Sequence, residues 1–115
     1  MKNLDYQIDY PNSEMKKVSD FVFNDWNVDP IPVSYNSRLS RYRGKYFQEF
    51  FAGQKIDEWI EIFKPKRLTY KMLYYVLSHE LAHYVQSEMS GYTDHDTEFK
   101  EIWDSIYNSV KKEMS

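Results

Sequence analysis

The spacing of apolar residues changes twice along this chain, which restricts it to a fold that combines helices with a sheet. In the first segment, apolar residues recur at the three- and four-residue spacing of an amphipathic helix: Met15, Val18, Val22 and Trp26. Between Val33 and Phe63 the sequence changes to runs of aromatic and β-branched residues, which is typical of strands. Beyond Pro65 the helical spacing returns. This order predicts an α+β fold with an N-terminal helix, three strands and two further helices.

The central region divides into three expected strands. They cover residues 33–35, 45–51 and 58–63, with Gly44 and Gly53 as the turns between them. Pro30 and Pro32 cannot lie inside a helix or a central strand, so the segment before the first strand is expected to be a loop. Because consecutive strands usually pair, we expect a three-stranded, mainly antiparallel meander.

Local signals suggest where two of the helices begin. Pro11-Asn12-Ser13 offers capping residues for the first helix. The last helix is expected to begin near Thr93 or Asp94, after a break at Gly91. Its apolar residues share one face: Phe99, Ile102, Trp103, Ile106, Tyr107 and Val110. With that start, His95 would lie on the core-facing stripe of the last helix.

The composition fits a single globular domain over residues 1–115. The chain is 42% hydrophobic and 18% aromatic, which gives enough apolar surface for a core. The absence of cysteine excludes disulfide frameworks, thiolate zinc fingers and cysteine nucleophiles. The N-terminus lacks the apolar run of a signal peptide, and no stretch reaches the ~18 apolar residues of a membrane span. We therefore expect a cytoplasmic protein without membrane association.

Two of the three histidines fall in the segment His79-Glu80-Leu81-Ala82-His83. On a helix, residues four apart lie one turn apart, with Cβ atoms roughly 5–6 Å from each other, so both imidazoles can bind one metal ion. Zinc accepts neutral imidazole nitrogen and tolerates an open fourth position. Glu80 follows the first histidine directly and can reach metal-bound water as a general base. The motif predicts zinc-dependent hydrolysis.

A catalytic zinc site needs a third protein ligand, and the remaining histidine, His95, is the first candidate. Packing of the last helix could turn it back toward the other two. The alternatives are carboxylates, as in sites with two histidines and one glutamate: Glu88, Glu98 and Glu101. Glu88 is expected to point away from the site on the HExxH helix, and Glu101 points off the apolar stripe. Glu98 has a plainer interpretation as a solvated first-turn acid.

The two histidine segments resemble those of the SprT-like metallopeptidase domains, the group that includes the Spartan proteases. That family has an HExxH helix followed by a third histidine in a His-Gly-x-x-Phe-like segment, and the second segment here is His95-Asp96-Thr97-Glu98-Phe99. Asp96 stands where the family commonly has glycine. Upstream, Asn36-Ser37-Arg38-Leu39 followed by Gly44 is similar to the family's strand region. The likeness spans residues 33–110.

The resemblance implies a zincin-like fold, zinc on His79, His83 and His95, and Glu80 as the catalytic base. It also implies hydrolysis of peptide bonds in a protein or peptide substrate, often one bound to DNA. Many members carry a cysteine zinc ribbon after the peptidase domain, whereas this sequence has no cysteine. The resemblance in the two histidine segments therefore does not imply a DNA-bound substrate for this chain. The expectation is a minimal SprT-like zinc metalloendopeptidase that holds one Zn²⁺ per chain.

Two other functions stay open from the sequence. A zinc-stabilised protein- or DNA-binding module would use the metal for folding energy without turnover. A nucleic-acid-binding accessory role would rest on the basic cluster of Arg38, Arg41, Arg43 and Lys45. The net charge of −3 does not favour nucleic acid as the main ligand, and a solvated charged face is the preferred interpretation of this cluster and of the second one, Lys64, Lys66, Arg67 and Lys71.

A hydrolase of this kind also needs a path for its substrate and a donor for the developing oxyanion. We expect an extended substrate to add to an exposed strand edge, with the last strand as the first choice. The candidates for the oxyanion donor are Tyr84, Tyr92 and Arg38, and the sequence does not assign the role to any of them.

Overall fold

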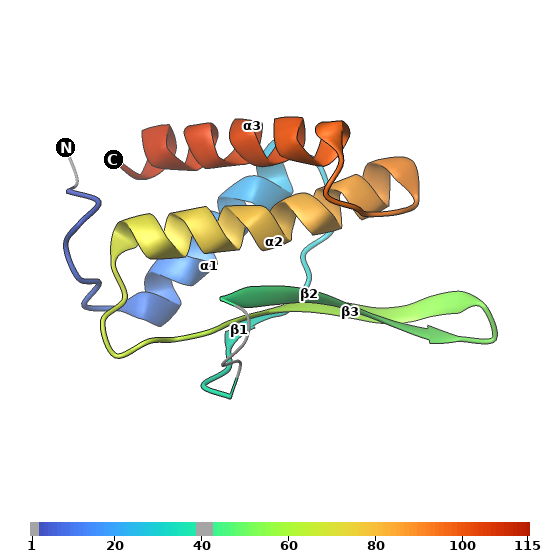
Figure 1. Ribbon diagram of the computed structural model, residues 1–115, viewed down its shortest axis with the longest axis horizontal. Helices are drawn as coiled ribbons and strands as arrows, with labels where there is room; N and C mark the ends of the chain where they lie inside the picture. The colour runs from blue at the N-terminus through green and yellow to red at the C-terminus, as the bar shows by residue number, and fades with distance from the viewer. Residues whose placement is uncertain (1–2, 39–42) are drawn as a thin grey trace.

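The computed structural model describes residues 3–38 and 43–115, and the predicted order of elements is confirmed in them (Figure 1). The elements are α1 (Pro11–Asp25), β1 (Val33–Tyr35), β2 (Gly44–Phe51), β3 (Gln54–Ile62), α2 (Tyr70–Ser90) and α3 (Thr97–Met114). The fold is α+β, with a mixed three-stranded sheet.

The sheet is not the meander that the strand spacing suggested. Its order is β1-β3-β2, so the last strand in sequence is the central one. β2 and β3 are antiparallel, whereas β1 pairs with β3 in parallel, with Val33 opposite Ile60. A two-residue turn joins β2 and β3, and β1 pairs with the edge of β3 opposite to β2. This order buries Ile60 and Ile62 at the centre of the sheet.

The two glycines of the strand region have different roles. Ala52 and Gly53 have φ of 51° and 80°, and they form the two-residue turn between the paired residues Phe51 and Gln54. Two consecutive positive φ values match the type I′ turn that suits a twisted hairpin. Gly44 was expected to be a turn as well, but it is the first residue of β2.

The helices cover one face of the sheet (Figure 1). α2 lies directly on it, α3 packs on the side of α2 away from the sheet, and α1 runs behind α2 and contacts β1. α2 therefore has few solvent-facing positions, and many of its residues are buried: Leu73, Tyr74, Leu77, Leu81, Ala82, Tyr84 and Val85. Burial of each large apolar side chain stabilises the fold by roughly 1.5–3 kcal/mol. The most buried helix is thus the one that carries the HExxH segment.

Of the two helix starts predicted from the sequence, that of α1 is confirmed and that of α3 is wrong. α1 does begin at Pro11, but its N-cap is Tyr10, whose side chain makes no capping hydrogen bond. Pro11 suits the first helical position because its φ is already helical. α3 begins at Thr97 rather than near Thr93 or Asp94, because the Asp96 side chain caps it by accepting a hydrogen bond from the Phe99 N–H. His95 therefore lies in the turn before α3 and is exposed.

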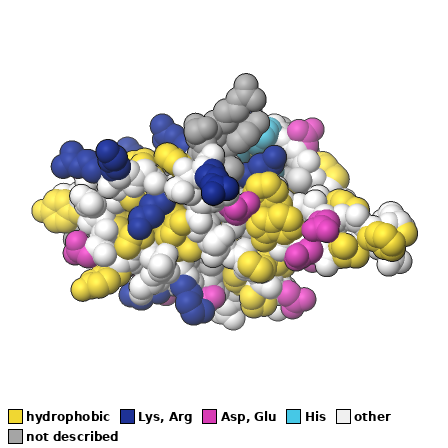
Figure 2. Space-filling model, turned by 90° about the horizontal axis from the view of Figure 1, so that it is seen from below, with side chains coloured by type: hydrophobic (Ala, Val, Ile, Leu, Met, Phe, Trp, Pro, Cys, Tyr) yellow, Lys and Arg dark blue, Asp and Glu magenta, His cyan; other side chains and the backbone are white. Residues whose placement is uncertain are grey.

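The outer face of the sheet carries aromatic and charged side chains. Phe47 and Trp59 stack with ring centroids 5.1 Å apart, and the Lys45 ammonium lies 5.1 Å from the Phe47 ring centroid. In the space-filling view from below, Lys and Arg side chains are spread over the face among hydrophobic and acidic ones (Figure 2). Within residues 3–38 and 43–115, no helix is both long and apolar enough to cross a membrane.

Candidate metal centre

The two histidines of the HExxH segment lie one turn apart in the middle of α2. Thr69 caps the start of this helix by accepting a hydrogen bond from the Met72 N–H, and Gly91 ends it with a φ of 76°. Both imidazoles are half-buried, with ring centroids 4.9 Å apart. α3 holds each of them by aromatic contact: Phe99 stacks on His83 at 4.3 Å, and Trp103 lies perpendicular to His79 at 4.5 Å.

His95 approaches the pair from the turn between α2 and α3. Its Nε2 atom lies 3.1 Å from His83 Nε2 and 3.3 Å from His79 Nε2. Two imidazole nitrogens bound to zinc at ~2.0–2.1 Å in tetrahedral geometry are about 3.3 Å apart, so these spacings fit such an ion. The candidate ligand atoms of all three residues lie within 4.8 Å of one another. The residues chosen from sequence are brought together, although His95 comes from a turn and not from the expected helix face.

The protonation of the buried pair suits a metal site. Burial lowers the pKa of His79 to about 4, helped by the neighbouring His95. Burial also lowers the pKa of His83 to about 4, with smaller effects from the other two histidines. Both imidazoles are therefore neutral near pH 7, and neutral imidazole is the form that binds a metal ion.

The Glu80 side chain extends from α2 and packs against the start of β2. Its side chain is 6% exposed, and its carboxylate accepts a hydrogen bond from the Tyr46 backbone N–H. Burial raises the pKa of Glu80 to about 7, although that hydrogen bond acts in the opposite direction. A general base works best when its pKa lies near the working pH. A cation bound to the histidines would favour the ionised carboxylate.

Gly44 allows the close approach of β2 to Glu80. A Cβ atom at this position would lie 3.0 Å from Glu80 Cγ, 3.0 Å from Val76 Cγ1 and 2.9 Å from Ile62 Cδ1. Any side chain would therefore displace the strand or the neighbouring side chains of Ile62, Val76 and Glu80. The glycine that the sequence suggested as a turn is a packing requirement of the candidate site.

A cavity of about 330 Å³ adjoins Glu80 and His79. Its lining includes aromatic, aliphatic and basic groups: Arg43, Gly44, Tyr75, Val76, His79, Glu80 and Trp103. From the sequence, Arg43 belongs to a basic cluster and Trp103 to the apolar face of the last helix, and no motif singles out Tyr75. The cavity arises where β2, α2 and α3 meet, so the only local hint was the position of Tyr75, four residues before His79 on the same helix.

The carboxylates considered as third ligands have other partners or lie apart. Glu88 contacts the Lys55 ammonium at 3.4 Å. Glu98 accepts hydrogen bonds from Ser90 at 2.7 Å and from Gln86 at 3.1 Å. Glu101 is exposed. Among the described residues, the group of possible ligands found within reach of one ion consists of the three histidines.

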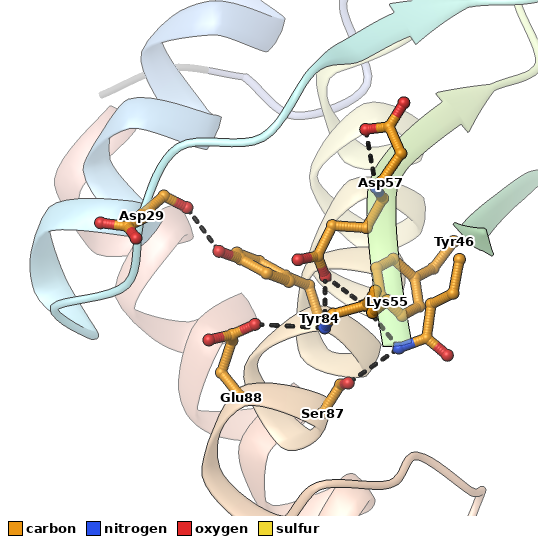
Figure 3. A network of polar contacts seen from close by, with 9 residues as sticks. Asp29, Tyr46, Lys55, Asp57, Tyr84, Ser87 and Glu88 are labelled. Carbon is orange, nitrogen blue, oxygen red and sulfur yellow. Dashed lines mark hydrogen bonds and ion pairs between the residues drawn. The ribbon is translucent and has the colours of Figure 1, made fainter. Parts of the chain in front are cut away.

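Figure 3 shows the structural contacts that side chains in the second half of α2 make with other elements. Tyr84 donates a hydrogen bond to the Asp29 carbonyl oxygen, and Lys55 joins Glu88 to Glu58 of β3. These contacts tie α2 to the hairpin and to the loop before β1. Tyr84 therefore has a structural role and is a poor oxyanion donor.

The other oxyanion candidates are not singled out by their contacts. The Tyr92 hydroxyl donates to Asp96, and the Arg38 backbone N–H donates to the Asn36 side chain. Arg38 is exposed. Arg41 of the basic cluster and Leu39 of the family-like strand segment lie outside the described residues.

Comparison of the chain with protein-family models, with curated proteins and with solved structures gave no match. Membership of the SprT-like family therefore stays a prediction that rests on the two histidine segments. The geometry of the three imidazoles and Glu80 carries the functional argument.

Proposed function

We propose that this protein is a zinc-dependent metallopeptidase of minimal SprT-like type, with a zincin-like fold. The observation that carries the proposal is the convergence of the three histidine Nε2 atoms, two of them at tetrahedral spacing from His95, beside a buried glutamate. His79, His83 and His95 would hold one Zn²⁺. Three imidazoles favour zinc over the hard cations Mg²⁺ and Ca²⁺, which select oxygen ligands.

Each group would have a defined task in peptide hydrolysis. Bound zinc supplies Lewis acidity, which polarises a carbonyl and lowers the pKa of a coordinated water to about 7. Glu80 would accept the proton of the attacking water and pass it to the leaving amine, because it follows His79 directly on α2 and lines the same cavity. Trp103 and Phe99 would keep the imidazoles of His79 and His83 in place.

Of the two edge strands in the described part of the sheet, β1 and β2, it is β2 that adjoins Glu80. β3 was the first choice from sequence, but over Ile60–Ile62 it is paired on both sides. In the described part of the chain, β2 pairs only with β3, and its first residues adjoin Glu80. A substrate strand along β2 would bring its carbonyl group near the histidines. The adjoining cavity of about 330 Å³ gives room for a large side chain next to the scissile bond.

One observation favours a non-catalytic zinc module as the second candidate. Glu80 is only 6% exposed, and its carboxylate already has a backbone partner at Tyr46. A glutamate with a purely structural role would look similar. A purely structural site, however, closes all four zinc positions with protein ligands. The histidine cluster supplies three, which leaves one position for water.

Metal dependence of proteolysis tests the proposal. Zinc-loaded protein is expected to cut an unfolded protein substrate, to lose this activity on treatment with 1,10-phenanthroline, and to regain it when zinc but not magnesium is added back. The readout is the appearance of peptide fragments by mass spectrometry. A His83→Ala variant purified in parallel controls for contaminating proteases. Cleavage that persists in the chelator or in this variant would contradict the proposal, and zinc binding without cleavage would favour the module.

A further inference from the structure

The side chain of Gln86 is fully buried one turn beyond the metal site, and all its hydrogen-bonding groups have partners. It is 0% exposed on α2. Its Oε1 accepts hydrogen bonds from the Thr93 hydroxyl and the Asp94 backbone N–H, each at 3.0 Å. Its Nε2 donates to Asp96 Oδ1 at 2.9 Å and to Glu98 Oε1 at 3.1 Å. One buried amide thus spans the whole turn that carries His95.

The orientation of this amide follows from its partners. A backbone N–H can only donate, so the atom that faces Asp94 must be the amide oxygen. The carboxylate oxygens of Asp96 and Glu98 accept the other two hydrogen bonds, so the other atom must be the NH₂ group. Flipping the amide would set its acceptor oxygen against the two carboxylates and its NH₂ group against the Asp94 N–H. The chemistry permits one orientation.

That orientation determines the direction in which the Thr93 hydroxyl hydrogen points. The hydroxyl in turn determines which ring nitrogen of His83 carries the proton. The amide oxygen carries no hydrogen, so the Thr93 hydroxyl must be the donor in their contact. Its oxygen then accepts from His83 Nδ1, which lies 2.6 Å away. With the proton on Nδ1, His83 Nε2 keeps its lone pair, and Nε2 is the atom that faces His95. A partner on the other ring nitrogen commonly fixes a metal-bound histidine in this way.

We propose that Gln86 is a positioning residue for the metal site, which fixes the His83 tautomer through Thr93 and holds the turn that presents His95. The inference rests on the proposed metal function of the three histidines. One buried side chain would then connect two of the three ligands: His83 through the hydroxyl relay, and His95 through the bonds to the residues on either side of it, Asp94 and Asp96.

A pair of substitutions at Thr93 tests the relay. Thr93→Val keeps the shape of the side chain and removes the hydroxyl, so zinc affinity is expected to fall about 10–100-fold, the usual effect of losing such a partner. Thr93→Ser keeps the hydroxyl and should bind zinc nearly as tightly as wild type. Gln86→Met removes the amide, and its affinity loss should be at least as large as that of Thr93→Val. Affinities are measured by competition with a chelator of known zinc affinity.

Ser87→Ala is the matched control for loss of a buried polar group. Ser87 is the next residue on α2, is also buried, and accepts a hydrogen bond from Gln48 of β2, so its partner belongs to the sheet and not to the turn that carries His95. It should lower the stability to urea and leave zinc affinity unchanged. If Ser87→Ala weakened zinc binding as much as Gln86→Met, the effect of Gln86 would be general destabilisation, and the inference would fail.

The tautomer of His83 in zinc-free protein gives a readout that does not depend on metal. Long-range ¹H–¹⁵N NMR spectra of the imidazoles should show the proton on Nδ1 in wild type and Thr93→Ser, and a shift toward Nε2–H in Thr93→Val. A wild-type His83 with its proton on Nε2 would overturn the inference whatever the zinc titration gives. The expected tautomer in a wild-type protein that binds no zinc would support the relay and overturn the proposed function instead.

Discussion

Glu80→Gln is expected to lower the rate of peptide hydrolysis by about 10²–10⁴-fold while zinc affinity stays at the wild-type level. The amide has nearly the shape of the carboxyl group, and its oxygen can still accept the hydrogen bond from the Tyr46 N–H. It cannot take a proton from water near neutral pH. The loss should therefore appear in kcat, measured on a fluorogenic peptide, with zinc content determined on the same sample.

The control for this prediction is Glu101→Gln, which makes the same chemical change at an exposed position of α3. It should leave both activity and zinc content unchanged. Full activity in Glu80→Gln would remove Glu80 from the mechanism. Loss of zinc in the same variant would show that the glutamate supports the metal instead of acting as a base.

His95→Ala is expected to weaken zinc binding by at least ~100-fold. This fall in affinity is larger than the one expected when a residue that only hydrogen-bonds to a metal ligand is removed. His95 supplies the nitrogen that lies within 3.3 Å of both other imidazoles. It lies in an exposed turn, so its removal leaves the core intact, and the circular dichroism spectrum should stay that of wild type. Zinc affinity is measured by the same chelator competition.

The carboxylates that could have replaced His95 provide the comparison. Glu88→Gln and Glu101→Gln should bind zinc as wild type does, because one contacts Lys55 and the other is exposed. If His95→Ala kept wild-type affinity and either glutamine variant lost it, the third ligand would be a carboxylate. The assigned histidine set would then be wrong.

The local parts of the site could be predicted from sequence because they depend on helix geometry alone. A spacing of four residues places His79 and His83 on one face of any regular helix, so no tertiary information was needed. His95 was predicted to join them, but for a reason that the structure does not bear out. The expected helix start near Thr93 missed the Asp96 cap, and the turn is instead held by the buried amide of Gln86.

The non-local parts could not be predicted, because they depend on contacts between segments far apart in the sequence. Strand order is decided by which edge of β3 the first strand reaches, and spacing along the chain does not encode this choice. The role of Gly44 could not be predicted for the same reason. A glycine between two strand-like runs is typical of a turn, and only the packing against Val76 and Glu80 explains why a glycine stands at this position. The cavity that Arg43 and Trp103 share likewise requires three elements to meet.

We expect the three imidazoles to hold one zinc ion with one position left for water. Zinc K-edge X-ray absorption of protein loaded with one equivalent of zinc tests it most directly. The prediction is four light-atom neighbours at ~2.0–2.1 Å, with the outer-shell scattering of three imidazole rings. Zinc that is not retained, or a spectrum with fewer than three imidazoles and added carboxylate oxygens, would contradict the account.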